Sequence, residues 1–285
     1  MIKLIMTDMD GTLLSSDSSI CQRNLDAIDY ARSQGALFGI ATGRDWASMK
    51  EATDIYHLKA DYMVLGNGAQ FVDQNGCVLM SAYLDKEHFL PITDIFDQLH
   101  LPYIVFTTKG YYALDPEYSK NCFIERTCQH LHVPYEDFTP QGKRKDSPCM
   151  NLKPMVSKKQ FLKEDLDIIK VESYSLDVDL IKEAKKQLAS LSGIAYLSSF
   201  EDNVEVTHQK AQKGLILEKA IQLLGIKKEE VIVLGDGLND GTMFDIFPYS
   251  YAPSNADNEI KNKAYKIGCH HDQGILGEAI DDLMK

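Results

Sequence analysis

Short, uninterrupted apolar runs that end in acidic residues and glycine constrain the fold of this chain more than any other feature. The clearest run, Val231–Leu234, is mostly β-branched and leads into Gly235-Asp236-Gly237. A continuous apolar run of this kind is typical of a strand buried on both faces, as in a parallel sheet. The same pattern occurs near the N-terminus at Lys3–Thr7, Leu37–Ala41 and Tyr62–Leu65. The sequence therefore predicts buried parallel strands, two of which end in carboxylates.

Helical patterns lie between these runs at both ends of the chain. We expect one helix between Ser19, as its N-cap, and Gly35, just past its end. A second helix covers Leu215–Leu224, which is amphipathic and ends at Gly225. Strands that alternate with helices predict a doubly wound α/β domain with a mainly parallel sheet.

The middle of the chain has a different pattern. Tyr103–Phe106 and Ile168–Val171 are predicted strands, and Leu180–Leu191 is one of several predicted helices among them. We therefore expect an α+β cap domain at 83–207, inserted into a core made of 1–82 and 208–285.

Composition narrows the classes of function. The formal net charge of −12 over 285 residues argues against a nucleic-acid partner, because such proteins present a basic surface. No apolar stretch is long enough for a membrane span, and Ile2–Met6 is too short for the core of a signal peptide. The six cysteines form no CxxC pair. We therefore expect reduced thiols and a cytoplasmic location.

The first acidic motif, Asp8-Met9-Asp10-Gly11-Thr12, follows the first predicted strand. Asp8 then stands at the carboxyl edge of the sheet, where ligands of open α/β folds bind. Two carboxylates that pack together repel each other, which raises one pKa unless a cation neutralises them. Such a pair suits a nucleophile and a proton donor. An ordinary Asp-Gly turn is the alternative for this motif taken alone.

A second acidic loop, Gly235-Asp236-Gly237-Leu238-Asn239-Asp240, favours the chemical interpretation because it also follows a buried strand. Mg²⁺ prefers hard oxygen ligands, and two or three carboxylates plus a substrate phosphate are sufficient to bind it. Asp8, Asp10 and Asp236 supply that set.

A bound phosphate also needs positive partners. Thr42-Gly43-Arg44 lies where a predicted strand passes into a helix, and it offers backbone N–H groups and a hydroxyl. Arg44 either approaches the phosphate or pairs with an acid at the helix start. Lys213 stands at the start of the second predicted helix, from which its ammonium reaches the same edge; a solvated lysine is the alternative.

These motifs together resemble the haloacid dehalogenase superfamily of phosphohydrolases, in its Cof-type branch with a large cap after the second motif. Four motifs match in order, and Gly66-Asn67-Gly68-Ala69 also resembles that branch. The four are Asp8-Met9-Asp10-Gly11-Thr12-Leu13, Thr42-Gly43-Arg44, Lys213-Gly214 and Gly235-Asp236-Gly237-Leu238-Asn239-Asp240.

The resemblance implies a magnesium-dependent phosphatase of small phosphorylated metabolites, such as a sugar phosphate or a phosphorylated cofactor. Asp8 would be the nucleophile, Asp10 the acid and base, and Asp240 the residue that orients Lys213. Magnesium would be held by the Asp8 carboxylate, the Asp10 main-chain carbonyl and Asp236. The implied phosphate-binding residues are Asp8, Met9, Thr42, Gly43, Lys213 and Asn239. The cap would supply most of the specificity.

Other interpretations stay open at this point. A phosphomutase would return the phosphoryl group to its substrate, and a receiver-type protein would store phosphate on an aspartate. The large insert and the second acidic loop fit the receiver poorly. A phosphate-binding regulator without catalysis is disfavoured by Asp10. Cys269-His270-His271-Asp272 is a weaker candidate for a transition-metal site.

Overall fold

The chain forms two compact units. The structure is a computed structural model that describes residues 1–142, 144–145, 147–198 and 201–285. The core unit comprises Met1–Ala82 and Lys210–Lys285, and the inserted unit comprises Tyr83–Gln209. The sequence predicts a phosphatase core at 1–82 and 208–285 and a specificity cap at 83–207. These assignments of separate tasks to the two domains stay predictions.

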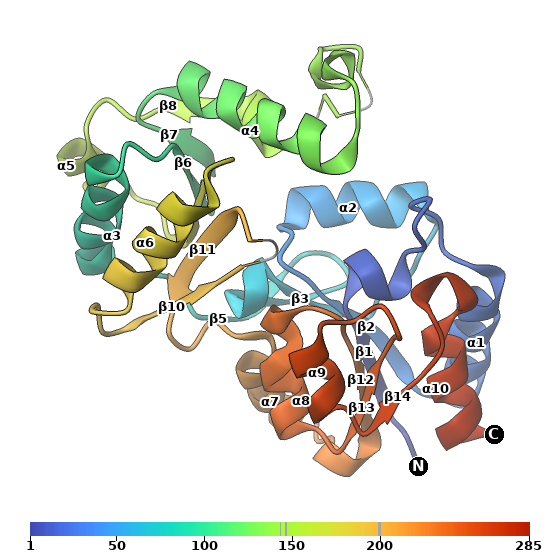
Figure 1. Cartoon of the computed structure of the whole chain (residues 1–285). Coiled ribbons are helices and arrows are strands. Elements are labelled where there is room, and N and C mark those ends of the chain that lie inside the picture. The colour runs from blue at the N-terminus through green and yellow to red at the C-terminus, as the bar shows by residue number, and fades with distance from the viewer. Residues whose placement is uncertain (143, 146, 199–200) are drawn as a thin grey trace. The chain divides into compact units, whose positions relative to one another are not determined.

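An eight-stranded sheet forms the centre of the core unit (Figure 1). Its first six strands in spatial order are parallel, and the last two form an antiparallel extension through the hairpin at Asn75-Gly76. The spatial order is β14 (Lys266–Ile267), β13 (Tyr249–Ala252), β12 (Val231–Leu234), β1 (Leu4–Thr7), β2 (Leu37–Ala41), β3 (Tyr62–Leu65), β4 (Gln70–Asp73) and β5 (Val78–Ser81). The predicted doubly wound α/β fold is confirmed.

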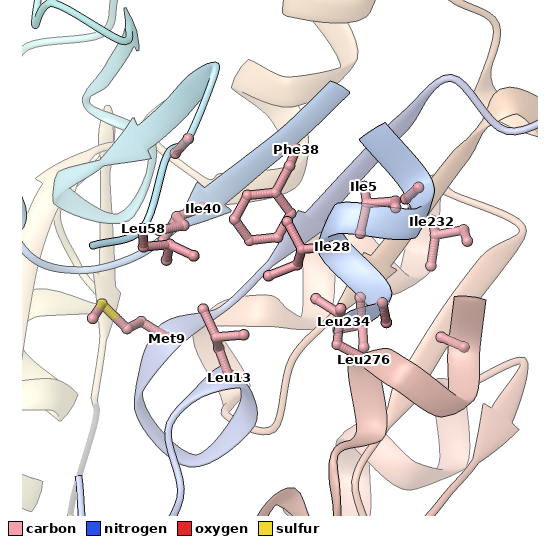
Figure 2. Close-up of a cluster of buried hydrophobic side chains, with 14 of the residues drawn as sticks. Ile5, Met9, Leu13, Ile28, Phe38, Ile40, Leu58, Ile232, Leu234 and Leu276 are labelled. Atoms are coloured by element: carbon pink, nitrogen blue, oxygen red, sulfur yellow. The ribbon is translucent and has the colours of Figure 1, made fainter. Parts of the chain in front are cut away.

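Two apolar cores lie on opposite faces of this sheet because neighbouring strand residues point to opposite faces. Ile5 belongs to one core and Leu4 and Met6 to the other. The first core contains residues of α1 (Gln22–Ser33), α2 (Trp46–Ile55) and α10 (Ile275–Met284). Figure 2 shows Phe38 of β2 between Ile40 and Ile28, with Leu276 of α10 nearby. The second contains residues of α7 (Lys213–Leu223), α8 (Gly241–Ile246) and α9 (Asn258–Lys263).

The inserted unit is an α+β structure with a six-stranded sheet. All neighbouring strands are antiparallel except β7 and β8. The order is β10 (Ile194–Leu197), β11 (Asn203–His208), β9 (Ile168–Tyr174), β6 (Tyr103–Thr107), β7 (Gly110–Ala113) and β8 (Leu152–Pro154). Its helices are α3 (Lys86–Gln98), α4 (Pro116–Leu131), α5 (Lys158–Phe161) and α6 (Val178–Leu188). One apolar core joins this sheet to α3, α5 and α6.

Two helix starts differ from the sequence-based expectation. Cys21, not Ser19, is the N-cap of α1. The Thr42-Gly43-Arg44 segment precedes α2, which begins at Trp46 with the Asp45 carboxylate accepting from Ser48 N–H at 3.0 Å. Thr42 N–H instead donates to the Val64 carbonyl, so the chain continues beside β3 before the helix starts.

The six cysteines are free. Among the described residues, no helix combines the length and the apolar character needed to span a membrane.

Candidate active site

Three parallel strands deliver the predicted site residues to one edge of the core-unit sheet. Asp8 directly follows β1, Thr42 directly follows β2, and Asp236 is the second residue after β12. Because carboxyl ends of parallel strands meet at one edge, loops that are more than 200 residues apart in sequence converge there. Lys213 starts α7 and is fully buried.

The Lys213 ammonium joins two of the acids. Its Nζ donates to Asp8 Oδ1 at 2.6 Å and to Asp240 Oδ1 at 2.6 Å. The second oxygen of Asp240, Oδ2, accepts from the backbone N–H groups of Asp236 and Gly237, each at 3.0 Å. Asp240 is itself fully buried. It therefore fixes both the lysine beside Asp8 and the backbone of the second acidic loop.

Asp236 is positioned by the first motif. Its Oδ1 accepts from the Thr12 hydroxyl at 2.8 Å. Gly11 has a positive φ of 79°, and a Cβ on this residue would lie 2.4 Å from Asp236 Oδ2. Glycine is thus required both by the backbone conformation and by the close approach of the carboxylate. Sequence reasoning quoted Thr12 within the motif but assigned it no contact, since the contact crosses 224 positions.

Burial and repulsion disturb the acids at this edge. Burial raises the pKa of Asp8 well above its ordinary value; Lys213 opposes this shift, and Asp240, Asp236 and Asp10 add to it. Burial, together with the charge of Asp240, raises the pKa of Asp236 to about 6. Burial alone would lower the pKa of Lys213, but attraction to Asp240 and Asp8 raises it. The lysine is therefore charged, but its single positive charge is smaller than the negative charge of the acids around it when they are ionised.

Asp10 faces a different environment. Its side chain is 59% exposed and forms a two-point ion pair with Arg44, whose Nε donates to Oδ2 at 2.9 Å and whose Nη2 donates to Oδ1 at 2.5 Å. Of the two roles left open for Arg44, the structure shows pairing with an acid. That acid is Asp10, the predicted proton donor. Nothing in the sequence indicated that Arg44 would pair with this particular acid.

The remaining predicted phosphate-binding residues lie around the same loops. The Thr42 hydroxyl accepts from Arg44 N–H at 3.2 Å. Met9 buries its side chain in the first apolar core, so only its backbone is left for a ligand. Asn239 lies in the short turn η6 (Leu238–Asp240), and its Nδ2 donates to Asn67 Oδ1 at 3.1 Å. Asn67 was not among the predicted site residues.

The donor set suits a divalent cation. Among the described residues, oxygen atoms of Asp8, Asp236 and Asp240 all lie within 4.8 Å of one another. Lys213 balances one of these carboxylates when all three are ionised, which leaves two negative charges. Hard oxygen ligands with that surplus are the ligands that Mg²⁺ prefers.

A second group of possible metal ligands, His270, His271 and Asp272, also lies within 4.8 Å. Its atoms already bind a neighbouring loop. His271 Nδ1 lies 2.6 Å from the Leu14 carbonyl oxygen, and the Asp272 carboxylate accepts from the N–H and the hydroxyl of Ser16. These contacts tie the loop after the first motif to the loop before α10.

Comparison with known proteins identifies the class. Residues 5–280 match the model of the haloacid dehalogenase-like hydrolase family, and the chain belongs to that family. The resemblance indicated by the four motifs is thereby confirmed.

Individual relatives are similar along their whole length. A 5-amino-6-(5-phospho-D-ribitylamino)uracil phosphatase, YwtE of Bacillus subtilis, is 26% identical over 99% of this chain and 98% of its own. The phosphatase YwpJ of the same organism is 24% identical over 99% and 100%. A solved haloacid dehalogenase-like hydrolase from B. subtilis superposes with a TM-score of 0.84 over 99% of this chain and 100% of that one, at 23% identity. The named phosphatases support the predicted enzyme class, a phosphoric monoester hydrolase.

Proposed function

We propose that this chain is a magnesium-dependent phosphatase that hydrolyses small phosphomonoesters through a phosphoryl group carried on Asp8. The observation that carries the proposal is the buried Asp8 carboxylate, held by Lys213 beside Asp236 with a surplus of negative charge. A carboxylate fixed in this way has one oxygen committed to the lysine and the other available to attack. Storage or recognition of phosphate alone would not require the acid Asp10 two residues away.

The reaction follows from the residues present. An Asp8 oxygen attacks phosphorus, the bond from phosphorus to the ester oxygen breaks, and Asp10 gives that oxygen its proton. Asp10 then takes a proton from water, whose oxygen attacks the aspartyl phosphate and restores Asp8 as inorganic phosphate leaves. Thr42, Lys213 and Asn239, with backbone N–H groups of Met9 and Gly43, bind the phosphoryl oxygens. Asp240 orients Lys213.

The metal proposal names ligands from the same set. The Asp8 carboxylate, the Asp10 main-chain carbonyl and Asp236 would hold Mg²⁺, which supplies positive charge against the phosphoryl oxygens. The inserted unit is proposed as the cap that selects the leaving group, since every residue assigned to phosphate and metal belongs to the core unit.

The proposed substrate class is inferred from the names of similar proteins. The name of YwtE states that it acts on a phosphorylated ribityl compound. We therefore propose a phosphorylated sugar, sugar alcohol or cofactor precursor as substrate for this chain.

A screen of phosphorylated metabolites with Mg²⁺, scored by release of inorganic phosphate, tests the proposal. We expect release with at least one such ester, and none with the Asp8→Asn variant. Conversion of a substrate to an isomeric phosphate without release would replace hydrolysis by a mutase reaction. A long-lived aspartyl phosphate with negligible turnover would instead favour a receiver-type function.

A further inference from the structure

Asn67 is a buried asparagine beside the residues of the predicted phosphate site. Asn67 is 1% exposed and occupies the short turn η2 (Gly66–Gly68) directly after β3. Its φ is +58°, and both flanking glycines also have positive φ. A side chain in this conformation is uncommon, and asparagine tolerates it better than most residues. A turn of this kind stores strain, which persists where the surroundings require it.

The contacts of this turn reach three segments that supply predicted phosphate-binding residues: Thr42-Gly43, the residue before Lys213, and Asn239. Asn67 N–H donates to the Thr42 carbonyl at 3.0 Å, and Asn67 Oδ1 accepts from Asn239 Nδ2 at 3.1 Å. A Cβ on Gly43 would lie 3.0 Å from the same Oδ1. A Cβ on Gly68 would lie 2.5 Å from the backbone of Gln212, which precedes Lys213.

The contact with Asn239 has a directional consequence. The nitrogen of a carboxamide carries two N–H donors, whereas its oxygen only accepts hydrogen bonds. An oxygen acceptor therefore pairs with the carboxamide nitrogen and not with the carboxamide oxygen. Asn67 Oδ1 therefore selects one of the two orientations of the Asn239 amide. One N–H of Asn239 is committed to Asn67, and the other is held in a defined direction.

We propose that Asn67 is a positioning residue for phosphate, acting through Asn239: it holds the Asn239 amide with an N–H toward the phosphoryl oxygens. This inference rests on the proposed function, since it assumes that Asn239 contacts the phosphoryl group. Asn67 binds neither the metal ligands nor the nucleophile in the contacts described. The effect to test is the one on phosphate binding through Asn239.

A double-mutant cycle in the full-length enzyme with Mg²⁺ tests the proposal. Asn67→Gly removes the side chain and keeps a residue that accepts positive φ. We expect about a three- to tenfold rise in KM and in the inhibition constant for inorganic phosphate, as for one lost hydrogen bond, with kcat within about twofold. Asn239→Ala should raise both constants at least as much. If Asn67 acts through Asn239, the double variant should be no worse than Asn239→Ala alone.

Three results would overturn it: additive effects of the two substitutions, an unchanged inhibition constant for phosphate in Asn67→Gly, or a lowered Tm with unchanged KM. Asn75→Gly, an equivalent change in the exposed β4–β5 hairpin, is the matched control and should leave KM unchanged. Failure of the proposed function has a separate signature, since the wild-type enzyme would then release no phosphate from any ester, or Asp8→Asn would release it as fast as wild type. If Asp8→Asn is inactive and Asn67→Gly behaves as wild type, only the positioning role fails.

Discussion

Among the described residues, each unit of the molecule has one buried lysine between two carboxylates, but the surroundings of the two lysines differ. In the core unit Lys213 lies between Asp8 and Asp240, and in the inserted unit Lys170 lies 3.1 Å from Glu172 and 2.5 Å from Glu205. Lys213 is fully buried and Lys170 is 6% exposed. In both cases burial lowers the lysine pKa and the neighbouring carboxylates more than restore it.

The difference lies in what surrounds each lysine. The partners of Lys170 are fixed on regular strands, since Glu172 is two residues along β9 and Glu205 is directly opposite Glu172 on β11. The Lys170 ammonium also lies 4.4 Å from the centre of the Phe106 ring, a favourable cation–π contact. The partners of Lys213 come from loops, with Asp236 adjacent to them. The Lys170 cluster has two carboxylates on regular strands, whereas the Lys213 cluster has a third carboxylate, Asp236, and therefore a larger negative surplus available to a ligand.

The largest expected effect concerns the nucleophile. Asp8→Asn should lower kcat by about 10⁴-fold or more, as is usual when a nucleophile is removed. The fold should persist, because a neutral amide replaces a carboxylate that burial disfavours. Phosphate release and a thermal melt measure the two outcomes. Activity within tenfold of wild type would contradict the assignment.

The comparison of the two lysines is tested by a matched pair of variants. Lys213→Met should lower kcat by about 10²- to 10³-fold, because it removes charge beside the phosphoryl group. Lys170→Met should leave kcat within about twofold but lower the free energy of unfolding by about 3 kcal/mol, because it strands two buried carboxylates. Lys213→Met also strands two buried carboxylates, Asp8 and Asp240, so urea unfolding should show a loss of stability in both variants and the kinetics separate them.

Replacing the whole Lys170 cluster sharpens this test. In Lys170→Met/Glu172→Met/Glu205→Met no buried charge is stranded, so most of the lost stability should return. Continued destabilisation by the triple variant, or loss of activity in Lys170→Met, would mean that the inserted cluster is not merely structural.

The surplus charge at the core site predicts a pH dependence of stability. The pKa of Asp236 is raised in the folded, metal-free protein to about 6, from an ordinary value of 3.8. The proton therefore binds the folded state more tightly, and the free energy of unfolding should fall as the pH rises from about 4 through about 6, by on the order of 2 kcal/mol.

Denaturant unfolding in chelator between pH 4 and 7.5 measures this effect. Asp236→Asn, which cannot ionise, should show a weaker dependence and should be the more stable protein at pH 7.5. Mg²⁺ should stabilise wild type more at pH 7.5 than at pH 5, because its ligands must be deprotonated. Identical pH profiles for the two proteins would contradict the assignment.

The smallest expected effect concerns the exposed acid. Arg44→Ala removes the two-point partner of Asp10 and should lower kcat by about tenfold, because the ionised Asp10, the proposed base on water, loses its fixed orientation. Arg44→Lys, which cannot form the planar two-point contact, should recover only part of that activity. Stability should change little, since Asp10 is 59% exposed. Unchanged kcat in both variants would remove Arg44 from the catalytic arrangement.

The sequence predicted what depends on local pattern. Buried runs such as Val231–Leu234 could be assigned to strands because they are short, rich in β-branched residues and followed by glycine, unlike a buried helix segment. The acids at Asp8 and Asp236 could be placed because a parallel sheet brings strand ends together. The predicted N-cap of α1, Ser19, was wrong. The observed N-cap, Cys21, lies two residues further along the chain, within the usual uncertainty of a helix boundary.

Contacts between distant loops could not be predicted. The pairing of Arg44 with Asp10 and of Asn67 with Asn239 depends on side-chain orientations across 34 and 172 positions. The Lys170 cluster was equally hidden, because alternating charged and apolar residues in a strand normally indicate a solvated face. In that strand both faces are buried, as only the packed structure shows.

Asp240 limits how this enzyme can diversify. One of its oxygens holds the lysine beside the nucleophile, and the other holds the backbone that presents Asp236. In the proposed mechanism, the affinity for phosphate and the affinity for metal therefore both depend on this one side chain, and neither could be tuned at this position without changing the other. Adaptation to a new substrate concentration or metal supply would have to begin at Asn239 or Thr12, where the two properties separate.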